Sequence, residues 1–157
     1  SCTLRFFTPE ELLTADLVPT HRDLIEAWRP APLEVAAAML TRGQTVLLCR
    51  RPEGKARALQ WEFPGGKLEP GETLKQAAER ELREELGVGV VALDELFRIT
   101  HETEHAVIRL RFIRTVLPEG EAVTPLEGQS FGWFDLKEPM PPDLLAPDRP
   151  VWEFLAE

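Results

Sequence analysis

The sequence contains no tyrosine, only two cysteines and three histidines, and no long hydrophobic run. The absence of tyrosine excludes chemistry that depends on a phenol. Cys2 and Cys49 cannot supply a disulfide framework. The histidines His21, His101 and His105 lack the spacing of a zinc site, and no serine stands with them as a nucleophile pair. Because no apolar segment approaches the roughly 20 residues that span a bilayer, no membrane partner is expected.

The chain is acidic, with a formal net charge of −9 and a pI of about 4.9. This charge argues against a broad surface for polymeric nucleic acid or for anionic lipid. It does not argue against a small nucleotide, whose phosphates would arrive with a metal ion. The N-terminal segment lacks the pattern of a signal peptide, so we expect a cytoplasmic protein. We expect it to be a monomer or a weak homodimer.

Residues 73–86 have the pattern of an amphipathic helix, and Gly87 suits the position just after its end. At 3.6 residues per turn, Glu81, Glu84 and Glu85 share one face. The edge that carries Glu81 and Glu85 also carries apolar side chains, Leu74 and Ala78. The opposite side carries polar residues that should face solvent: Gln76, Glu79 and Arg83.

Clustered carboxylates on a core-facing edge repel one another and are costly to desolvate. A cation at this edge would offset both effects, and oxygen ligands without histidine favour Mg2+, with Mn2+ possible, over zinc. The alternative is a solvated acidic helix. The loop before the helix favours the metal site, because its adjacent glycines, Gly65 and Gly66, suit a turn or a close approach.

The stretch from Gly66 to Val88 resembles the Nudix box, G-x5-E-x7-R-E-U-x-E-E-x-G-U, where U is a bulky aliphatic residue. Every specified position matches: Gly66, Glu72, Arg80, Glu81, Leu82, Glu84, Glu85, Gly87 and Val88. The resemblance implies an α/β fold, a sandwich of α/β/α type with a mixed sheet and the box on a loop–helix–loop. It also implies hydrolysis of a nucleoside diphosphate linked to another moiety.

The resemblance also implies roles for the residues of the box. Glu81 is expected to be a metal-linked carboxylate and the general base, and Glu84 and Glu85 are expected to be metal ligands. Glu84 is also expected to take part in catalysis. Arg80 is expected to pair with Glu81 or its neighbours and fix their geometry. Four further residues have expected roles: the Gly65 carbonyl, just before the box, as a metal ligand, Glu72 as a buttress of the loop or of a second metal, and Gly66 and Gly87 as structural glycines.

Segments outside the box resemble those of MutT-like enzymes of the 8-oxo-dGTP diphosphatase and CTP pyrophosphohydrolase types. Arg51, which follows an apolar strand pattern, is expected to face the substrate phosphates; a solvated strand end is the alternative. The segment Trp61–Lys67 extends the resemblance and adds Glu62 and Lys67 as substrate-binding candidates.

Two downstream segments complete the resemblance. Glu127 is expected to be a further acid near the metal, with a loop glutamate in water as the alternative. Phe131 is expected to line the substrate pocket. Asp148 lies in a segment similar to the base-holding segment of these enzymes. MutT-type enzymes that favour oxidised guanine often have Asn there, so Asp148 raises cytosine or another base as an alternative.

The rest of the chain predicts one mixed α/β domain. Strands are expected at 33–40, 45–50, 88–98, 105–116 and 132–134, with a second helix at 151–156. The domain is expected to span residues 32–157. Residues 1–31 are expected to form a helical extension, with the tail of an upstream domain as the alternative.

These features predict a Mg2+-dependent pyrophosphohydrolase. Its substrate is a nucleoside triphosphate, of which oxidised 8-oxo-dGTP is one candidate, and its products are a nucleoside monophosphate and pyrophosphate. The alternatives are a (d)CTP or modified-pyrimidine pyrophosphohydrolase and a Nudix domain that senses a ligand without turnover. The intact glutamates of the box argue against the sensor.

Overall fold

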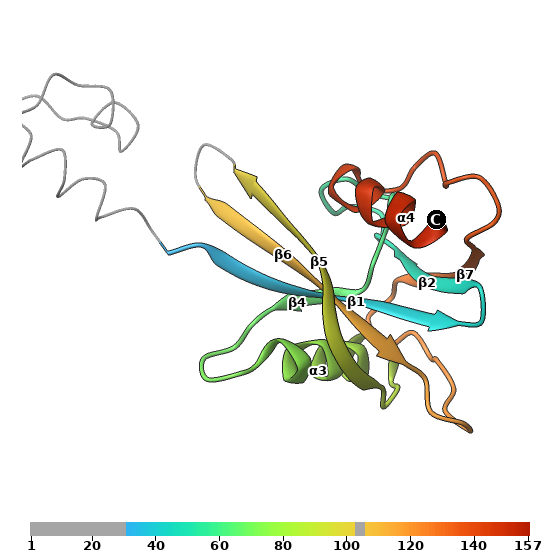
Figure 1. The fold of residues 1–157 in the computed structure, drawn as a ribbon, viewed down its shortest axis with the longest axis horizontal. Coiled ribbons are helices and arrows are strands. Elements are labelled where there is room, and N and C mark those ends of the chain that lie inside the picture. The colour runs from blue at the N-terminus through green and yellow to red at the C-terminus, as the bar shows by residue number, and fades with distance from the viewer. Residues whose placement is uncertain (1–30, 103–105) are drawn as a thin grey trace, which may run out of the picture.

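The computed structural model describes residues 31–102 and 106–157. Figure 1 shows a twisted sheet with one helix on each side. The longer strands are β1 (Leu33–Arg42), β2 (Thr45–Arg50), β5 (Val91–Glu102), β6 (Val107–Val116) and β7 (Ser130–Asp135). The short strands are β3 (Trp61–Glu62) and β4 (Gly65–Lys67). The helices are α3 (Leu74–Leu86), α4 (Arg149–Ala156) and the 3-10 turn η1 (Ala146–Asp148).

Strand β1 is the centre of the mixed sheet, whose main order is β3-β2-β1-β6-β5. It pairs in parallel with β6 from Leu33 to Thr41 and antiparallel with two strands on its other edge. The first half of β1 pairs with β4, and only its last two residues pair with β2. Strand β2 then diverges from β1 and pairs with β3 and β7. The divergence leaves β4 and the segment before it between β1 and β2.

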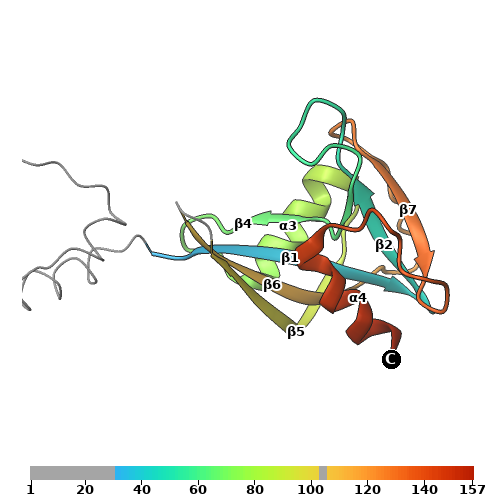
Figure 2. The same cartoon turned by 90° about the horizontal axis from the view of Figure 1, so that it is seen from above.

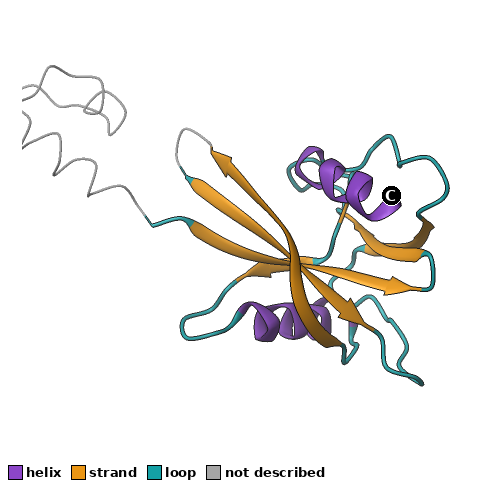
Figure 3. Cartoon of the chain, viewed as in Figure 1, coloured by secondary structure: helices purple, strands orange, loops and turns teal. Residues whose placement is uncertain are grey.

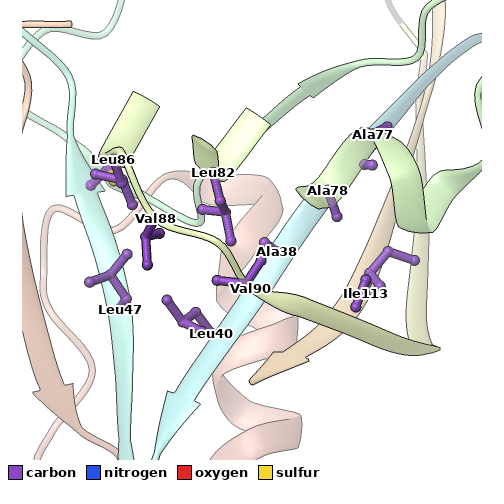
Figure 4. Close-up of a cluster of buried hydrophobic side chains, with 13 residues drawn as sticks. Ala38, Leu40, Leu47, Ala77, Ala78, Leu82, Leu86, Val88, Val90 and Ile113 are labelled. Atoms are coloured by element: carbon purple, nitrogen blue, oxygen red, sulfur yellow. The ribbon is translucent and has the colours of Figure 1, made fainter. Parts of the chain in front are cut away.

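The alternation of side chains along β1 builds two cores. Ala36, Ala38 and Leu40 pack toward α3, whereas Ala37 and Met39 pack toward α4. Figure 4 shows the first core, where Leu82 and Leu86 of α3 point at the sheet. Figure 2 shows the same two helices from above, and Figure 3 colours helices and strands differently in the view of Figure 1. The predicted α/β/α arrangement with a mixed sheet is confirmed.

Helix α3 follows the sequence closely. Thr73 is its N-cap and forms a capping box with Gln76, in which each side chain accepts a hydrogen bond from the backbone of the other. Gly87 ends the helix in the left-handed conformation, φ 59°, and donates to the Arg83 carbonyl. One expectation was wrong. Glu79 is half-buried and accepts from the Ala92 N–H, because β5 passes beside this turn of the helix.

Most strand predictions are confirmed, with shifted ends. The turn expected at Thr41 begins at Gly43, and the run expected as a strand from residue 88 enters the sheet only at Val91. Strands β3 and β4 were not predicted. A Cβ on Gly65 would lie 2.8 Å from the Ala37 Cα and closer still to the Ala36 carbonyl oxygen, so only glycine lets β4 approach β1.

Two other expectations concern the whole chain. The helical extension predicted for residues 1–31 lies, apart from Ala31, outside the described residues, so the proposed domain division stays a prediction. Within the described ranges, no helix is both long enough and apolar enough to cross a membrane.

Candidate active site

Arg80 is the centre of the box loop and its helix. Its Nε and Nη2 donate to the two oxygens of Glu72 at 2.7 and 3.0 Å. Its Nη1 donates to Glu81 at 2.9 Å and to Glu84 at 3.1 Å, and Nη2 also reaches the Lys67 carbonyl at 2.9 Å. The expected pairing of Arg80 with Glu81 is therefore present. The surrounding carboxylates raise the pKa of the guanidinium further above its already high value.

Glu72 holds the loop before α3. Its bidentate pair with Arg80 lowers the pKa of the Glu72 carboxyl, and the same carboxylate accepts from the Glu69 N–H at 3.1 Å. Glu72 therefore buttresses the loop, which is one of its two expected roles. Its role at a second metal stays a prediction.

Gly66 leaves room for the carboxylate of Glu81. A Cβ on Gly66 would lie 2.8 Å from Glu81 Oε2 and nearer still to Oε1. The glycine thus lets the loop lie directly against the acid. Burial raises the pKa of Glu81, and the hydrogen bond from Arg80 opposes this shift.

A cleft of about 390 Å³ opens between β2, the β3–β4 segment and the end of α3. It gathers five of the residues singled out in the sequence: Arg51, Glu62, Gly65, Glu85 and Glu127. The other residues that line it were not predicted: Cys49, Arg50, Pro52, Lys55, Pro64 and Gln129. We call this space the first cleft.

Negative charge is concentrated on one wall of the first cleft. Burial raises the pKa of Glu85 to about 8, and repulsion from Glu81, Glu127 and Glu62 adds to the effect. A hydrogen bond from the Gly65 backbone opposes it. Burial also raises the pKa of Glu62, although Arg51 donates to that carboxylate at 3.1 Å.

Glu127 reaches the first cleft because its loop is tied to the end of α3. The Thr124 N–H donates to the Leu86 carbonyl and the Leu126 N–H to the Glu85 carbonyl, both at 2.8 Å. These bonds satisfy carbonyls that a helix end leaves free. They place Glu127 at the cleft wall that Glu85 also lines.

The residues at this wall fit a hard divalent cation by donor type and by charge. Carboxylate oxygens and a backbone carbonyl are the ligands that such ions prefer. The pKa of Glu85 is raised mainly by burial and further by repulsion from Glu81, Glu127 and Glu62, and a bound cation would offset both effects. In the described ranges, no three carboxylates are already gathered in a group that could hold an ion. Two of the expected ligands, Glu81 and Glu84, are hydrogen-bonded to Arg80 instead.

Other expected site residues lie outside the first cleft. The Lys67 side chain is exposed, and its backbone accepts from Arg80. Phe131 packs against the core on the α3 side, directly across from Cys49 in the β2–β7 pair.

Burial also raises the pKa of the Cys49 thiol well above its usual value, so this cysteine is unreactive where it lies.

Asp148 is buried beneath the segment that leads from β3 to β4. Its side chain is only 5% exposed, and Oδ2 accepts from the Phe63 N–H at 2.9 Å. Burial raises the pKa of Asp148 to about 7, against that hydrogen bond. The carboxyl group therefore changes charge near neutral pH.

A second cleft, of about 500 Å³, was not predicted. It lies between the loop 51–60, β5 and the segment 144–149, and its lining includes Pro147 and Arg149, the neighbours of Asp148. The sequence did contain a signal that the loop has a function, because Arg50, Arg51, Lys55 and Arg57 form a basic cluster within eight positions of an acidic chain. Spacing along the sequence could not show that three separate segments form one cleft.

Comparisons with known proteins agree with this geometry. The model of the NUDIX domain matches residues 31–154. A protein of Escherichia coli K12 named CTP pyrophosphohydrolase is 34% identical over 77% of this chain and 89% of its own length. An 8-oxo-dGTP diphosphatase of Proteus vulgaris is 38% identical over 51% of this chain and 72% of its own. The solved E. coli ORF135 protein superposes with a TM-score of 0.68 at 34% identity, covering 79% of this chain and 89% of that one.

The chain belongs to the Nudix family. It is a hydrolase that acts on acid anhydrides.

Proposed function

We propose that the protein is a Mg2+-dependent pyrophosphohydrolase that cleaves a nucleoside triphosphate to a nucleoside monophosphate and pyrophosphate, with 8-oxo-dGTP as the first candidate. The observation that carries the proposal is the divided lining of the first cleft. Basic side chains, Arg50, Arg51 and Lys55, occur there with the carboxylates Glu62, Glu85 and Glu127. Such a cleft suits a phosphate chain that is shared between cationic side chains and a carboxylate-bound cation.

The proposed reaction consumes one water and breaks one phosphoanhydride bond. Gly65, Glu81, Glu84, Glu85 and Glu127 are the residues that would hold the ion. When bound, Mg2+ supplies neutralisation of phosphate charge. Glu81 is our candidate to accept the proton of the attacking water, and burial, which raises its pKa, makes it a stronger base. Arg80 holds Glu81 in place, and Arg51 is the candidate to contact the phosphates.

A second candidate is a (d)CTP or modified-pyrimidine pyrophosphohydrolase. The 34% identical relative is named CTP pyrophosphohydrolase. An ionised Asp148 would also accept a hydrogen bond from an exocyclic amino group, as cytosine has. Protonated, it could donate to a carbonyl instead, and its pKa of about 7 makes both forms available. A ligand sensor without turnover is disfavoured because the box keeps every glutamate.

The test is a panel of nucleoside triphosphates incubated with Mg2+, with products identified by phosphorus NMR. We expect monophosphate and pyrophosphate in equal amounts. Where a glutamate of the site is replaced by glutamine, Glu119→Gln is the matched control, because Glu119 is exposed and lines neither cleft. Inorganic phosphate and a diphosphate as the products, or no turnover of any nucleotide, would overturn the proposal.

A further inference from the structure

The second cleft differs in chemistry from the first. Apolar side chains, among them Ile99, Leu144 and Leu145, line part of it. The charged or titratable groups in its lining are Arg57, His101 and Arg149. Among the described residues that line it there is no carboxylate, although the chain carries a formal charge of −9. A flat heterocycle with an electronegative edge suits an apolar surface bordered by hydrogen-bond donors.

The segment behind this cleft is fixed by the backbone. The Trp61 N–H donates to the Asp143 carbonyl and the Leu145 N–H to the Trp61 carbonyl, at 2.9 and 2.8 Å. Arg149 donates to the carbonyls of Pro142 and Leu144, so its guanidinium holds the segment in place.

Arg57 lies on the loop that joins the two clefts. Arg51 and Lys55 of this loop line the first cleft, whereas Arg57 and Gln60 line the second. Only this loop separates the two clefts. A ligand with its phosphates in the first cleft can therefore place another group in the second cleft.

The loop holds Arg57 in an unusual backbone conformation. Its φ is +56°, in the left-handed region that non-glycine residues rarely adopt. The Leu59 N–H donates to the Arg51 carbonyl and Arg50 Nε to the Leu59 carbonyl, both at 3.0 Å. Such strain costs about 1–3 kcal/mol and gathers at functional sites. It persists here because the hydrogen bonds around it fix the loop.

We propose that Arg57, supported by His101, selects nucleotides by the carbonyl edge of the base. A guanidinium can only donate, so it suits the oxygens of guanine or oxidised guanine and gains nothing from an amino group. His101 is two residues from Ile99 on β5, so both side chains face the same side of the strand, and the ring adds an N–H. This inference rests on the proposed function. It ranks 8-oxo-dGTP, whose base has two ring carbonyls, above dGTP and dCTP, whose bases have one each, and it ranks dATP, whose base has none, last.

The test compares Arg57→Met with Arg98→Met. Met keeps an unbranched side chain like the aliphatic part of Arg and has the same backbone cost at positive φ, but it has no donor. Arg98 carries the same charge on β5, is 53% exposed and lines neither cleft. For Arg57→Met we expect KM to rise about tenfold for 8-oxo-dGTP and dGTP and less than about twofold for dATP, with kcat unchanged. Arg57→Lys should recover part of the loss, and Arg98→Met should match the wild type.

A common change for all nucleotides, or no change, would overturn the inference and leave the hydrolase intact. Calorimetric titration with 8-oxo-dGMP and with dAMP, in chelator, measures the same base preference without turnover. If no nucleotide is hydrolysed, the proposed function fails, yet a preference for 8-oxo-dGMP that Arg57→Met removes still supports the inference. Should Arg57→Met not fold, His101→Leu takes its place, and the same selective loss is expected.

Discussion

The carboxylate of Glu81 occupies the space that a side chain on Gly66 would need. A Cβ there would lie 2.8 Å from Oε2 and nearer to Oε1, so loop and acid can be adjacent only when residue 66 is glycine. The position of the candidate general base thus depends on a residue without a side chain.

Gly66→Ala should lower kcat by about a hundredfold, since a displacement of about 1 Å at a reacting group can cost this much. Circular dichroism should show an intact fold. Gly43→Ala is the matched control: nothing lies within 4 Å of its added Cβ, but its φ is +60°. It should lower the melting temperature and leave kcat unchanged. Equal kcat in Gly66→Ala and wild type would contradict the packing argument.

The pKa of Glu85 predicts how stability depends on pH. Its folded value, about 8, lies above the ordinary 4.5, so the folded state binds the proton more tightly than the unfolded state. Stability in chelator should therefore increase as pH falls from about 9 toward 5, and be lost as pH rises through 8. Asp148, with a pKa of about 7 against 3.8, acts in the same direction.

Glu85→Gln should reduce this slope and raise the melting temperature at pH 9 in chelator by about 2–4 °C, the shift expected from about 1 kcal/mol in a domain of this size. Glu119→Gln should leave both unchanged. Thermal melts from pH 5 to 9 make the measurement. A slope in Glu85→Gln as steep as in the wild type would show that Glu85 is not the group responsible.

Metal should stabilise the fold. A cation offsets the repulsion around Glu85, and binding to the folded state adds stability as RT ln(1 + [L]/Kd). We expect a higher melting temperature in millimolar Mg2+ than in chelator at equal ionic strength. Sodium chloride at that ionic strength is the control. A melting temperature that is the same in Mg2+ and in chelator would mean that the carboxylates are only solvated.

Thr115 offers a test of the core. Its side chain is fully buried in β6, and its hydroxyl has no hydrogen-bond partner among the described residues. Thr115→Val keeps the shape and removes the unsatisfied group, so the protein should be stabilised by about 1 kcal/mol. Thr100→Val, at an exposed position of β5, should change little. Urea titration distinguishes the two, and a destabilised Thr115→Val would point to a partner for the hydroxyl.

Local chemistry explains what the sequence could predict. The ends of α3 follow from Thr73 and Gly87, whose effects reach only a few residues. Strands β3 and β4 were missed because they are two and three residues long and exist only through pairing with β2 and β1. The burial of Asp148 likewise depends on Phe63, which is 85 positions away.

The candidate site divides in the same way. Helical spacing placed Glu81 and Glu85 correctly on one inward edge, where burial raises the pKa of both and repulsion between carboxylates adds to it. It was wrong for Glu84, which was expected on the same edge but is exposed and paired with Arg80. Spacing could not show that Arg80 would engage Glu72, Glu81 and Glu84 together. Nor could it place Arg57 and His101 at one cleft, because the fold alone brings the loop and β5 together.

The central claim is that the carboxylates around Glu85 hold the divalent ion that hydrolysis needs. Mn2+ binding by electron paramagnetic resonance, with dGTP turnover measured in the same samples, tests it most directly. Wild type and Glu119→Gln should bind and turn over equally, whereas Glu85→Gln should bind at least about tenfold more weakly and turn over about a hundredfold more slowly. Glu85→Gln that binds Mn2+ and hydrolyses dGTP like the wild type would contradict the account.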